Sequence, residues 1–531
     1  MDFDGNRPER RVTIAVRPGR ALRERPRLFG VLETAFPVSF VPLDGEVSAA
    51  AAPTIVFAAS GDRIAADELA RGGEPAFVLG AEDAGAARPA RLGNDRDLDA
   101  RLHGVELPDR PGAHRVAPDG PATLFATASD GPAWMRRATG GTTVDLLAGS
   151  LPELGEDEIL RDLLPERALT LVALVQFLRE AGADAAYTPP PLRAAFLFDD
   201  PNLRWRTYGF IDYGELLRDA EEHGYHASMA MVPLDNRFAH AETIDLFRRH
   251  PERLSLVFHG NDHSSRELLR PRSETSALAL AAQALRRAER FESRYELGID
   301  RVMTPPHGMC SEKVAAALAA VGFDGLCAIH PLPWAERPPG NRPLAGWDPA
   351  EFAAGCAVIP RLHLHSTDAD IALRAFLDQP LVFYGHHEDV AKGLEPLGAI
   401  AARVARMGAA HWCSIGEIAA TNYAARRDLD TLRVRPYSNR VAVDVPAGCD
   451  QLILARPRGV EATVSGWSIG AGAPAPFDTA LPVTPGSRLE LRVRREDERP
   501  PTAIKSPPPR PWAILRKVAM EARDRTLPLR A

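Results

Sequence analysis

Cysteine is scarce in this sequence, and long apolar runs are absent. The five cysteines are scattered, odd in number and without a CxxC pair, which argues against a disulfide framework and favours reduced thiols. No apolar run reaches the roughly 18 residues of a membrane span, and the N-terminus lacks the continuous apolar core of a secretory signal. We therefore expect a cytoplasmic protein without a transmembrane segment. Lys and Arg total 64 against 71 Asp and Glu, and no basic stripe indicates a nucleic-acid partner.

The chain is too long for one hydrophobic core, because 531 residues correspond to about three domains of ordinary size. In residues 1–188, short β-type runs alternate with helical stretches, which predicts an α/β domain of Rossmann-like or flavodoxin-like type. Neither GxGxxG nor a Walker P-loop occurs there, so no nucleotide site is predicted. Residues 156–180 are expected to form a long amphipathic helix that closes the domain. The proline-rich segment 187–191 reads as a stiff linker.

Residues 190–425 have the most regular pattern in the chain. Strand-like and helical segments repeat in turn, which predicts parallel strands with right-handed crossovers in a closed (β/α) barrel. The expected strands number seven, one fewer than in the usual barrel, and lie at 194–198, 226–232, 254–258, 300–303, 325–329, 358–364 and 381–384.

The last part of the sequence contains two segments with different residue patterns. Residues 430–497 alternate polar and apolar positions between Gly, Pro and Asp turns, which predicts a small antiparallel β-sandwich. Residues 498–531 form a proline-rich tail in which 500–511 are expected to lack regular structure and 512–525 to form a basic amphipathic helix. A terminal docking helix is favoured for this segment, with peripheral contact to a membrane surface or a partner as the alternative.

Two short motifs at the ends of expected barrel strands carry the chemistry. Asp199 and Asp200 end one apolar run, and His259 and His263 lie four residues apart at the end of another. A carboxylate and two imidazoles can hold a divalent metal and leave positions open, while the second carboxylate serves as a base. If a helical turn follows His259, both rings share one face. Each motif alone also fits a turn or ordinary histidines, but catalytic groups gather at this rim of such barrels.

With these motifs the sequence resembles the NodB-type polysaccharide deacetylases, a carbohydrate esterase family with a distorted (β/α)7 barrel. The resemblance implies that Asp199 is the catalytic base. It also implies that the other members of the two motifs bind the metal: Asp200, His259 and His263.

A third segment matches the family in part. Where the family has Arg-Pro-Pro-aromatic-Gly, this chain has Thr304-Pro305-Pro306-His307-Gly308. The resemblance implies that the backbone N–H at His307, beside Pro306, helps to bind the oxyanion. The arginine that steadies the base in the family is replaced by Thr304, and Arg204 and Arg301 are candidates to take its place.

Histidines near the end of the barrel complete the expected site. The resemblance implies that His386 protonates the leaving group, with His387 as the alternative. His363 and His365 alternate on one expected strand, and either line the site or are ordinary polar positions. Trp347 either walls a sugar pocket or packs in the core.

The resulting expectation is a metal-dependent hydrolase that removes an acyl group, most plausibly N-acetyl, from an amino sugar or polysaccharide precursor. Zinc suits two imidazoles and a carboxylate, and cobalt, nickel or iron also fit. Two alternatives stay open. One is a glycoside hydrolase that pairs an aspartate with Glu388 or Asp389, and the other is a non-catalytic carbohydrate-binding or assembly protein on a degenerate deacetylase barrel.

Overall fold

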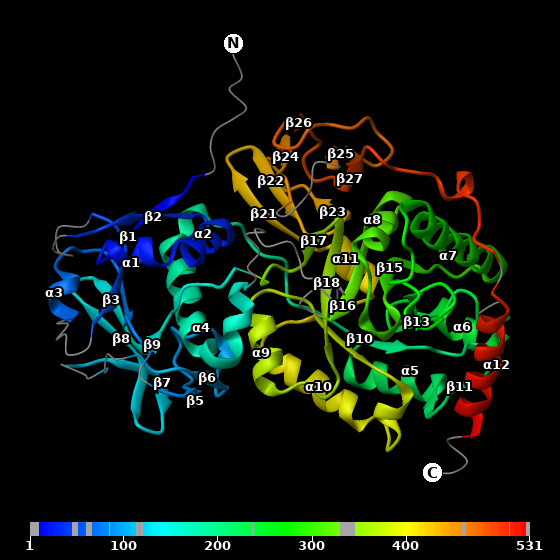
Figure 1. Ribbon diagram of the computed structural model, residues 1–531, viewed down its shortest axis with the longest axis horizontal. Helices are drawn as coiled ribbons and strands as arrows, with labels where there is room; N and C mark the ends of the chain where they lie inside the picture. Colours follow the sequence, from blue (N-terminus) through cyan, green and yellow to red (C-terminus); the bar gives the residue numbers. More distant parts are fainter. Residues whose placement is uncertain are drawn as a thin grey trace. The chain divides into compact units, whose positions relative to one another are not determined.

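In the structure, a computed structural model, the chain folds into two units (Figure 1). The first comprises Met1–Tyr187 with Pro339–Trp347 and Thr367–Phe376, and the second comprises the remaining chain. The residues that the structure describes are 10–44, 51–59, 66–83, 85–112, 116, 120–156, 158–235, 238–329, 346–457, 464–508 and 510–526.

The first unit is built on one mixed sheet. Its described strands are, in sheet order, β2 (Val38–Pro42), β1 (Val12–Arg17), β3 (Thr54–Ala58), β4 (Ala76–Gly80), β9 (Thr142–Ser150), β8 (Gly131–Thr139), β7 (Thr123–Ala128), β5 (Arg88–Leu92) and β6 (Glu106–Asp109). The pairings from β2 to β9 are parallel, as an α/β layer requires, with α1 (Arg20–Glu24), α2 (Pro26–Ala35) and α3 (Ala66–Ala70) in the crossovers. The pairings from β9 to β6 are antiparallel and were not expected from the sequence.

The long helix of the first unit differs from the amphipathic helix expected at 156–180. Helix α4 (Leu164–Ala181) begins later, after a 3₁₀ turn at Leu160–Leu163, and every residue from Arg167 to Leu178 is buried. It packs against β6 and β9, and Arg179 donates to the Phe376 carbonyl of α9 (Asp368–Phe376) at 2.7 Å. The expectation of one polar face was wrong because a helix covered on several sides needs apolar residues all round.

The second unit contains the expected closed barrel. Its strands, in order around the barrel, are β10 (Arg193–Asp199), β13 (Ala227–Met231), β14 (Leu254–His259), β15 (Asp300–Thr304), β16 (Gly325–Ile329), β18 (Cys356–His363) and β19 (Leu381–Gly385). All seven pairings, including the closing pair of β19 and β10, are parallel. β10 is buried along its whole length, as a strand covered on both faces must be.

Helices surround these strands and complete the (β/α)7 arrangement (Figure 1). In the second unit, α5 (Tyr213–His223), α6 (Ala241–Arg249), α7 (Glu274–Tyr295) and α8 (Glu312–Val321) follow the first four barrel strands in turn. Helix α10 (Glu395–Arg406) follows β19, and α11 (Ile415–Ala420) follows the short strand β20 (His411–Trp412). Local capping agrees with these boundaries: Asp212 accepts the N–H of Gly214 and Glu215 at the start of α5, and Gly224 ends it in a left-handed conformation.

Two small sheets pack face to face after the barrel. One has the order β21 (Tyr423–Asp428), β22 (Thr431–Pro436), β24 (Gln451–Leu454), β26 (Ala480–Pro482), and the other β23 (Arg440–Asp444), β27 (Arg488–Arg495), β25 (Val464–Ile469). Val434 and Leu452 from one sheet share a core with Trp467 and Leu491 from the other, which makes a sandwich. The expectation of a wholly antiparallel sandwich was wrong at β22 and β24, which pair in parallel. Residues 462–463 of an expected strand lie outside the described residues.

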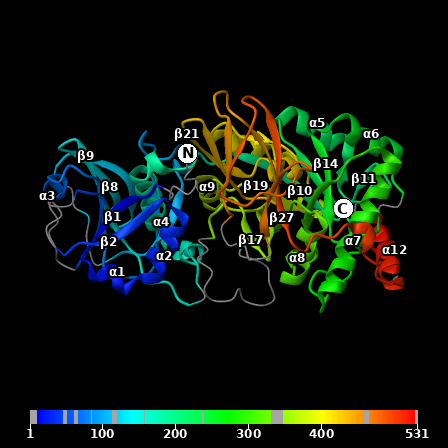
Figure 2. The same ribbon diagram turned by 90° about the horizontal axis from the view of Figure 1, so that it is seen from above.

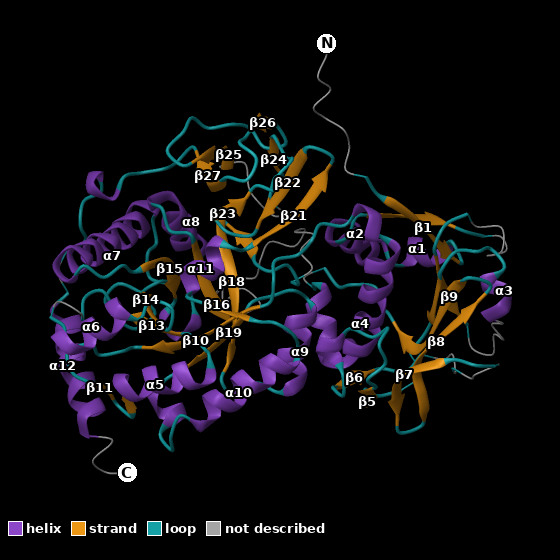
Figure 3. Cartoon of the chain, turned by 180° about the vertical axis from the view of Figure 1, so that it is seen from behind, coloured by secondary structure: helices purple, strands orange, loops and turns teal. Residues whose placement is uncertain are grey.

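The proline-rich tail makes specific contacts, contrary to expectation. Pro501–Ala503 form a 3₁₀ turn, and Arg286 of α7 donates to the carbonyls of Pro501 and Ile504, the latter at 2.9 Å. Helix α12 (Pro511–Thr526) follows, and Figure 3 shows it as the last helix before the C-terminus. Among the described residues, no helix combines the length and apolar character that crossing a bilayer requires.

Asn439 joins the barrel to the sandwich. Its buried side chain accepts the Ala357 N–H at 2.9 Å and donates to the Gly355 carbonyl at 2.8 Å, both next to the start of β18. Its own N–H donates to the Asp324 carbonyl at 2.9 Å. The side-chain amide of Asn439 thus gives hydrogen-bond partners to a buried N–H and a buried C=O, which would otherwise be buried without any partner.

We expect Asn439→Ala to lower the free energy of unfolding by about 2 kcal/mol or more, because it leaves a buried N–H and a buried C=O unpaired. Asp444→Ala on β23 is the control: its exposed ion pair with Arg488 spans 3.3 Å, and removing such a pair costs about 0–1 kcal/mol. Urea unfolding measures both. Equal effects of the two variants would show that Asn439 is not a structural link.

Candidate metal centre at the barrel rim

The carboxyl ends of the parallel strands bring the predicted site residues together. β10 ends at Asp199, β14 at His259 and β15 at Thr304, while β19 ends just before His386. Because these strands run in the same direction, their last residues meet at one rim of the barrel.

Asp199 and Asp200 both reach this rim because the backbone changes conformation between them. On a regular strand, neighbouring side chains point to opposite sides. Asp200, however, has a φ of +64°, in the left-handed region. Its neighbour is anchored by the Tyr208 hydroxyl, which donates to the Asp199 carbonyl at 2.6 Å. Both carboxylates consequently approach His259, with one at each ring nitrogen, 3.7 Å away in each case.

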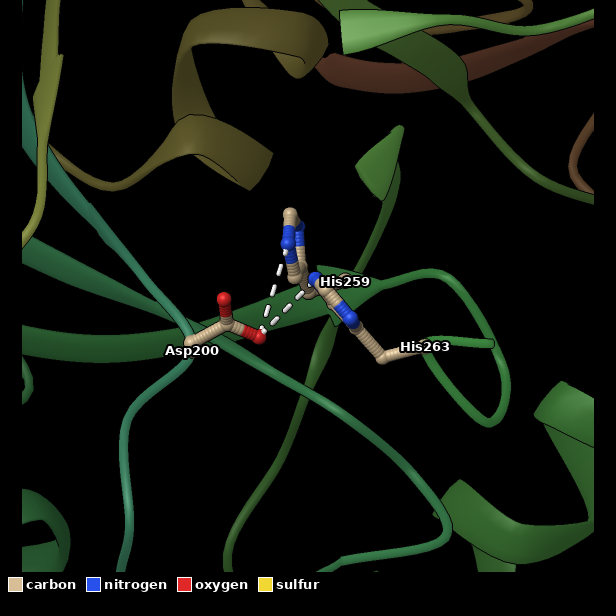
Figure 4. A group of neighbouring side chains, drawn as sticks. All are labelled: Asp200, His259 and His263. Carbon is tan, nitrogen blue, oxygen red and sulfur yellow. Dashed lines mark ion pairs between the residues drawn. The ribbon is translucent and has the colours of Figure 1, made fainter. Parts of the chain in front are cut away.

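Asp200, His259 and His263 form a cluster with the composition of a metal site (Figure 4). Asp200 Oδ1 lies 3.2 Å from His263 Nε2 and 3.7 Å from His259 Nε2. Burial lowers the pKa of His259 to about 4, so this ring is neutral at physiological pH. Burial opposes ionisation of Asp200, but the two histidines outweigh it and hold the pKa of its carboxyl below the ordinary range. An ionised carboxylate beside a neutral imidazole is what a divalent cation requires.

The donor atoms of this cluster also fit a divalent metal ion. Asp200 Oδ1 is buried, and no group among the described residues makes a well-oriented hydrogen bond to it. A buried carboxylate oxygen without a hydrogen bond is costly unless another ligand satisfies it. Carboxylate and imidazole donors converging on one point suit zinc or another divalent transition metal.

The segment from Gly260 to His263 is a loop, so the condition of a helical turn after His259 is not met. Gly260 and His263 have φ of +64° and +48°, and the two imidazole centroids nevertheless lie 5.0 Å apart. Glu267 holds this loop: its carboxylate accepts the N–H of Asn261, Asp262 and His263 at 2.7, 2.9 and 3.1 Å. A Cβ at Gly260 would overlap Glu267 and Pro306, so glycine is required there.

Thr304, which stands where the resembled family has arginine, orients His259. Its hydroxyl donates to the Phe258 carbonyl at 2.8 Å, which uses its only proton. The contact of 2.9 Å between Thr304 Oγ1 and His259 Nδ1 therefore requires the proton on Nδ1. Nε2 is left with its lone pair facing Asp200, which is the tautomer of a metal ligand.

The arginine beside Asp199 comes from an expected strand, β18, but the arginine itself was not among the residues predicted for the site. Arg361 on β18 donates to both Asp199 oxygens, at 3.1 and 3.0 Å, and both side chains are buried. Its guanidinium also lies 4.2 Å from the centroid of the Tyr384 ring. The two candidates named from the sequence are engaged elsewhere, Arg204 with Glu521 and Arg301 with Glu292. An arginine inside the apolar run Cys356–His363 was the available signal, because buried charges are rare without a partner.

His307 lies beside His263. It has a φ of +58°, and its ring centroid is 5.1 Å from that of His263. No acceptor for its backbone N–H is found within the described part of the chain, so this donor is available to a ligand. Pro306, buried beside it, packs toward Gly260.

His386 and His387 have different environments. His386 is exposed, its N–H donates to Asp389 Oδ2 at 2.8 Å, and its charge contributes to lowering the pKa of Asp200. His387 is fully buried, with its ring centroid 4.8 Å from that of Tyr208. Of the two, His386 is the one that solvent and a substrate can reach.

The remaining predicted positions lie apart from the Asp200 cluster. His365 and His363 are 3.1 and 4.0 Å from Asp389 and form a separate, more exposed group. Glu388 lies 3.6 Å from Arg523 of α12. Trp347 is 5% exposed and belongs to the first unit, so a role in a sugar pocket stays a prediction.

Comparison with known proteins gives likenesses to solved structures only. No family model and no curated protein matches the chain. The carbohydrate deacetylase Agd3 is 10% identical with a TM-score of 0.47, over 91% of this chain and 98% of that one. A family 4 carbohydrate esterase from Streptomyces lividans is 15% identical (TM-score 0.28; 46% of this chain, 100% of that one). Peptidoglycan deacetylase PdaC from Bacillus subtilis is 11% identical (0.26; 44% and 91%). At these identities and TM-scores, the comparisons assign no role to any residue, so residue roles have to be inferred from the positions of the side chains.

We expect Thr304→Val to weaken zinc binding by about 10- to 100-fold, because the shape is kept but the group that fixes the His259 tautomer is lost. Isothermal titration with zinc measures this. Thr367→Val, at the exposed start of α9, is the control and should bind zinc as the wild type does. Unchanged affinity in Thr304→Val would contradict the orienting role.

Proposed function

We propose that this protein is a metal-dependent hydrolase that removes an acyl group, most simply N-acetyl, from an amino sugar or a polysaccharide precursor. One observation carries the proposal: a carboxylate clamped by a buried arginine, Asp199 with Arg361, lies beside a second carboxylate that converges with two imidazoles. A site with a base and a separate ligand set is the combination that metal-assisted hydrolysis needs.

Each residue has a definite task in this reaction. Asp200, His259 and His263 would hold a divalent cation, which when bound would polarise the acyl carbonyl and lower the pKa of the attacking water. Asp199, kept in place by Arg361, accepts a proton from the attacking water. The N–H of His307 donates to the oxyanion as it develops. His386, exposed at the rim, donates a proton to the departing amine nitrogen, so that the products are a carboxylate and a free amine.

The carboxylates that a glycoside hydrolase would need as partners are engaged in other contacts. Asp389 accepts from His386 and lies 3.1 Å from His365, and Glu388 faces Arg523. That alternative also leaves two buried histidines beside Asp200 without a task. Hydrolysis of an acyl group is therefore the simpler account of the whole cluster.

The test is acetate release from N-acetylglucosamine oligomers. We expect activity to disappear when the metal is removed by a chelator and to return when zinc or cobalt is added. Asp199→Asn should lower kcat by about 100-fold or more while zinc still binds, because only the base is lost. His223→Ala, at an exposed histidine at the end of α5, is the control. New reducing ends without acetate would instead indicate a glycosidase, and zinc-independent activity would contradict the proposal.

Arg361→Met gives a second test, because methionine keeps much of the volume but removes the charge. We expect lower kcat with little change in KM, and a loss of about 3–5 kcal/mol in the free energy of unfolding, because Asp199 stays buried without its partner. The double variant Arg361→Met with Asp199→Asn should recover part of the stability but none of the activity. Thermal and urea unfolding with steady-state kinetics separate the two effects.

A further inference from the structure

Helix α12 has its apolar face toward solvent and its polar face toward the protein. Trp512, Ile514, Leu515 and Val518 are 70, 54, 61 and 60% exposed. The spacing of these residues places them on one side of the helix. A helix docked on a globular domain normally has the reverse orientation. Figures 1 and 2 show α12, in red, at the outer edge of the second unit.

Polar contacts hold the inner face of α12 in place. Arg516 donates to Asp235 Oδ2 at 2.8 Å, and Lys517 contacts the Asp235 carbonyl. Glu521 accepts from Arg204 and from the indole of Trp205, both at 3.2 Å. The orientation of the helix is therefore specified by several directed contacts, and the exposed apolar face is a consequence of them.

A cationic cavity opens beside the first turn of the same helix. Its volume is about 540 Å³, and Ile514 belongs both to its lining and to the exposed apolar face. The charged residues among the described lining are Arg270, Arg287, Lys505 and Arg510 against a single carboxylate, Asp262.

Two of these cationic side chains donate to the same serine hydroxyl. Arg270 and Arg510 both donate to Ser264 Oγ, at 3.1 and 3.3 Å. Asp262, the only acid in the described lining, lies 4.0 Å from Arg510. The cavity thus carries an excess of positive charge in a chain whose formal net charge is −7, and it suits an anionic group.

We propose that the outer face of α12 docks onto an anionic lipid bilayer, with a lipid phosphate entering the cationic cavity. The apolar side chains would enter the boundary between headgroups and acyl chains, and the arginines and lysine would meet the phosphates. The positive charge of the cavity favours an anionic bilayer, because a purely apolar partner surface would provide no anionic group for the cavity. The cationic cavity borders the proposed acyl-hydrolysis site at Asp262, which is next to His263 in the chain, and the inner face of α12 shares a second, small cavity with Asp200.

Flotation with vesicles tests this inference on the full chain. We expect the wild type to float with vesicles that contain phosphatidylglycerol and not with vesicles of phosphatidylcholine alone, and to be released by high salt. The variant W512S/L515S/V518S should bind more than about tenfold more weakly, because three apolar anchors are lost. Lys505→Gln and Arg510→Gln should each weaken binding by about fivefold.

Leu429→Ser is the matched control, because Leu429 is 88% exposed but lies in the turn between β21 and β22. It should bind vesicles as the wild type does. Failure of the wild type to bind anionic vesicles, or equal binding by the triple variant with an unchanged unfolding transition, would overturn the inference. A dimer that the triple variant converts to a monomer, measured by light scattering without lipid, would assign the face to a second copy and would also overturn it.

Discussion

The buried ion pair between Asp199 and Arg361 is the interaction on which the rest of the site depends. A carboxylate that is only 3% exposed needs a partner of opposite charge in an apolar barrel, because desolvation of a lone charge is very unfavourable. Arg361 donates to both oxygens from β18, which is separated from β10 in the barrel by the single strand β19. The pair fixes the direction of Asp199, and Asp200 is then turned by its left-handed backbone toward the two histidines.

The loops around this pair adopt strained backbone conformations at the positions of the proposed site residues. Asp200, His263 and His307 all have positive φ, which costs about 1–3 kcal/mol each for residues other than glycine. Such conformations persist only where other contacts impose them. Glu267 supplies those contacts by accepting three backbone N–H groups, and Tyr208 supplies another at the Asp199 carbonyl. The strain is therefore concentrated where the proposed ligands meet.

The sequence was sufficient for the barrel and its strand ends because both follow from local patterns. Apolar runs followed by Asp199 and by His259 mark where parallel strands stop, and all seven expected barrel strands are present. Arg361 and Thr304 could not be assigned in this way, since their roles depend on which strands become neighbours across the barrel. Whether a helical turn follows His259 could not be predicted for a related reason. Spacing alone does not distinguish a helix from a loop that a distant residue, Glu267, holds in shape.

Helix α12 shows how periodicity can predict a helix but not its orientation. The alternation of Trp512, Leu515 and Val518 with Arg516 and Lys517 indicates two faces, and hydrophobic burial would turn the apolar face inward. The opposite orientation is stable here because the available surface is polar: Asp235 and Arg204 offer charges that apolar side chains would leave unpaired and buried. Pairing those groups costs less than desolvating them. The apolar face is then left for another partner, and the adjoining cationic cavity makes anionic lipid the partner whose chemistry fits both surfaces.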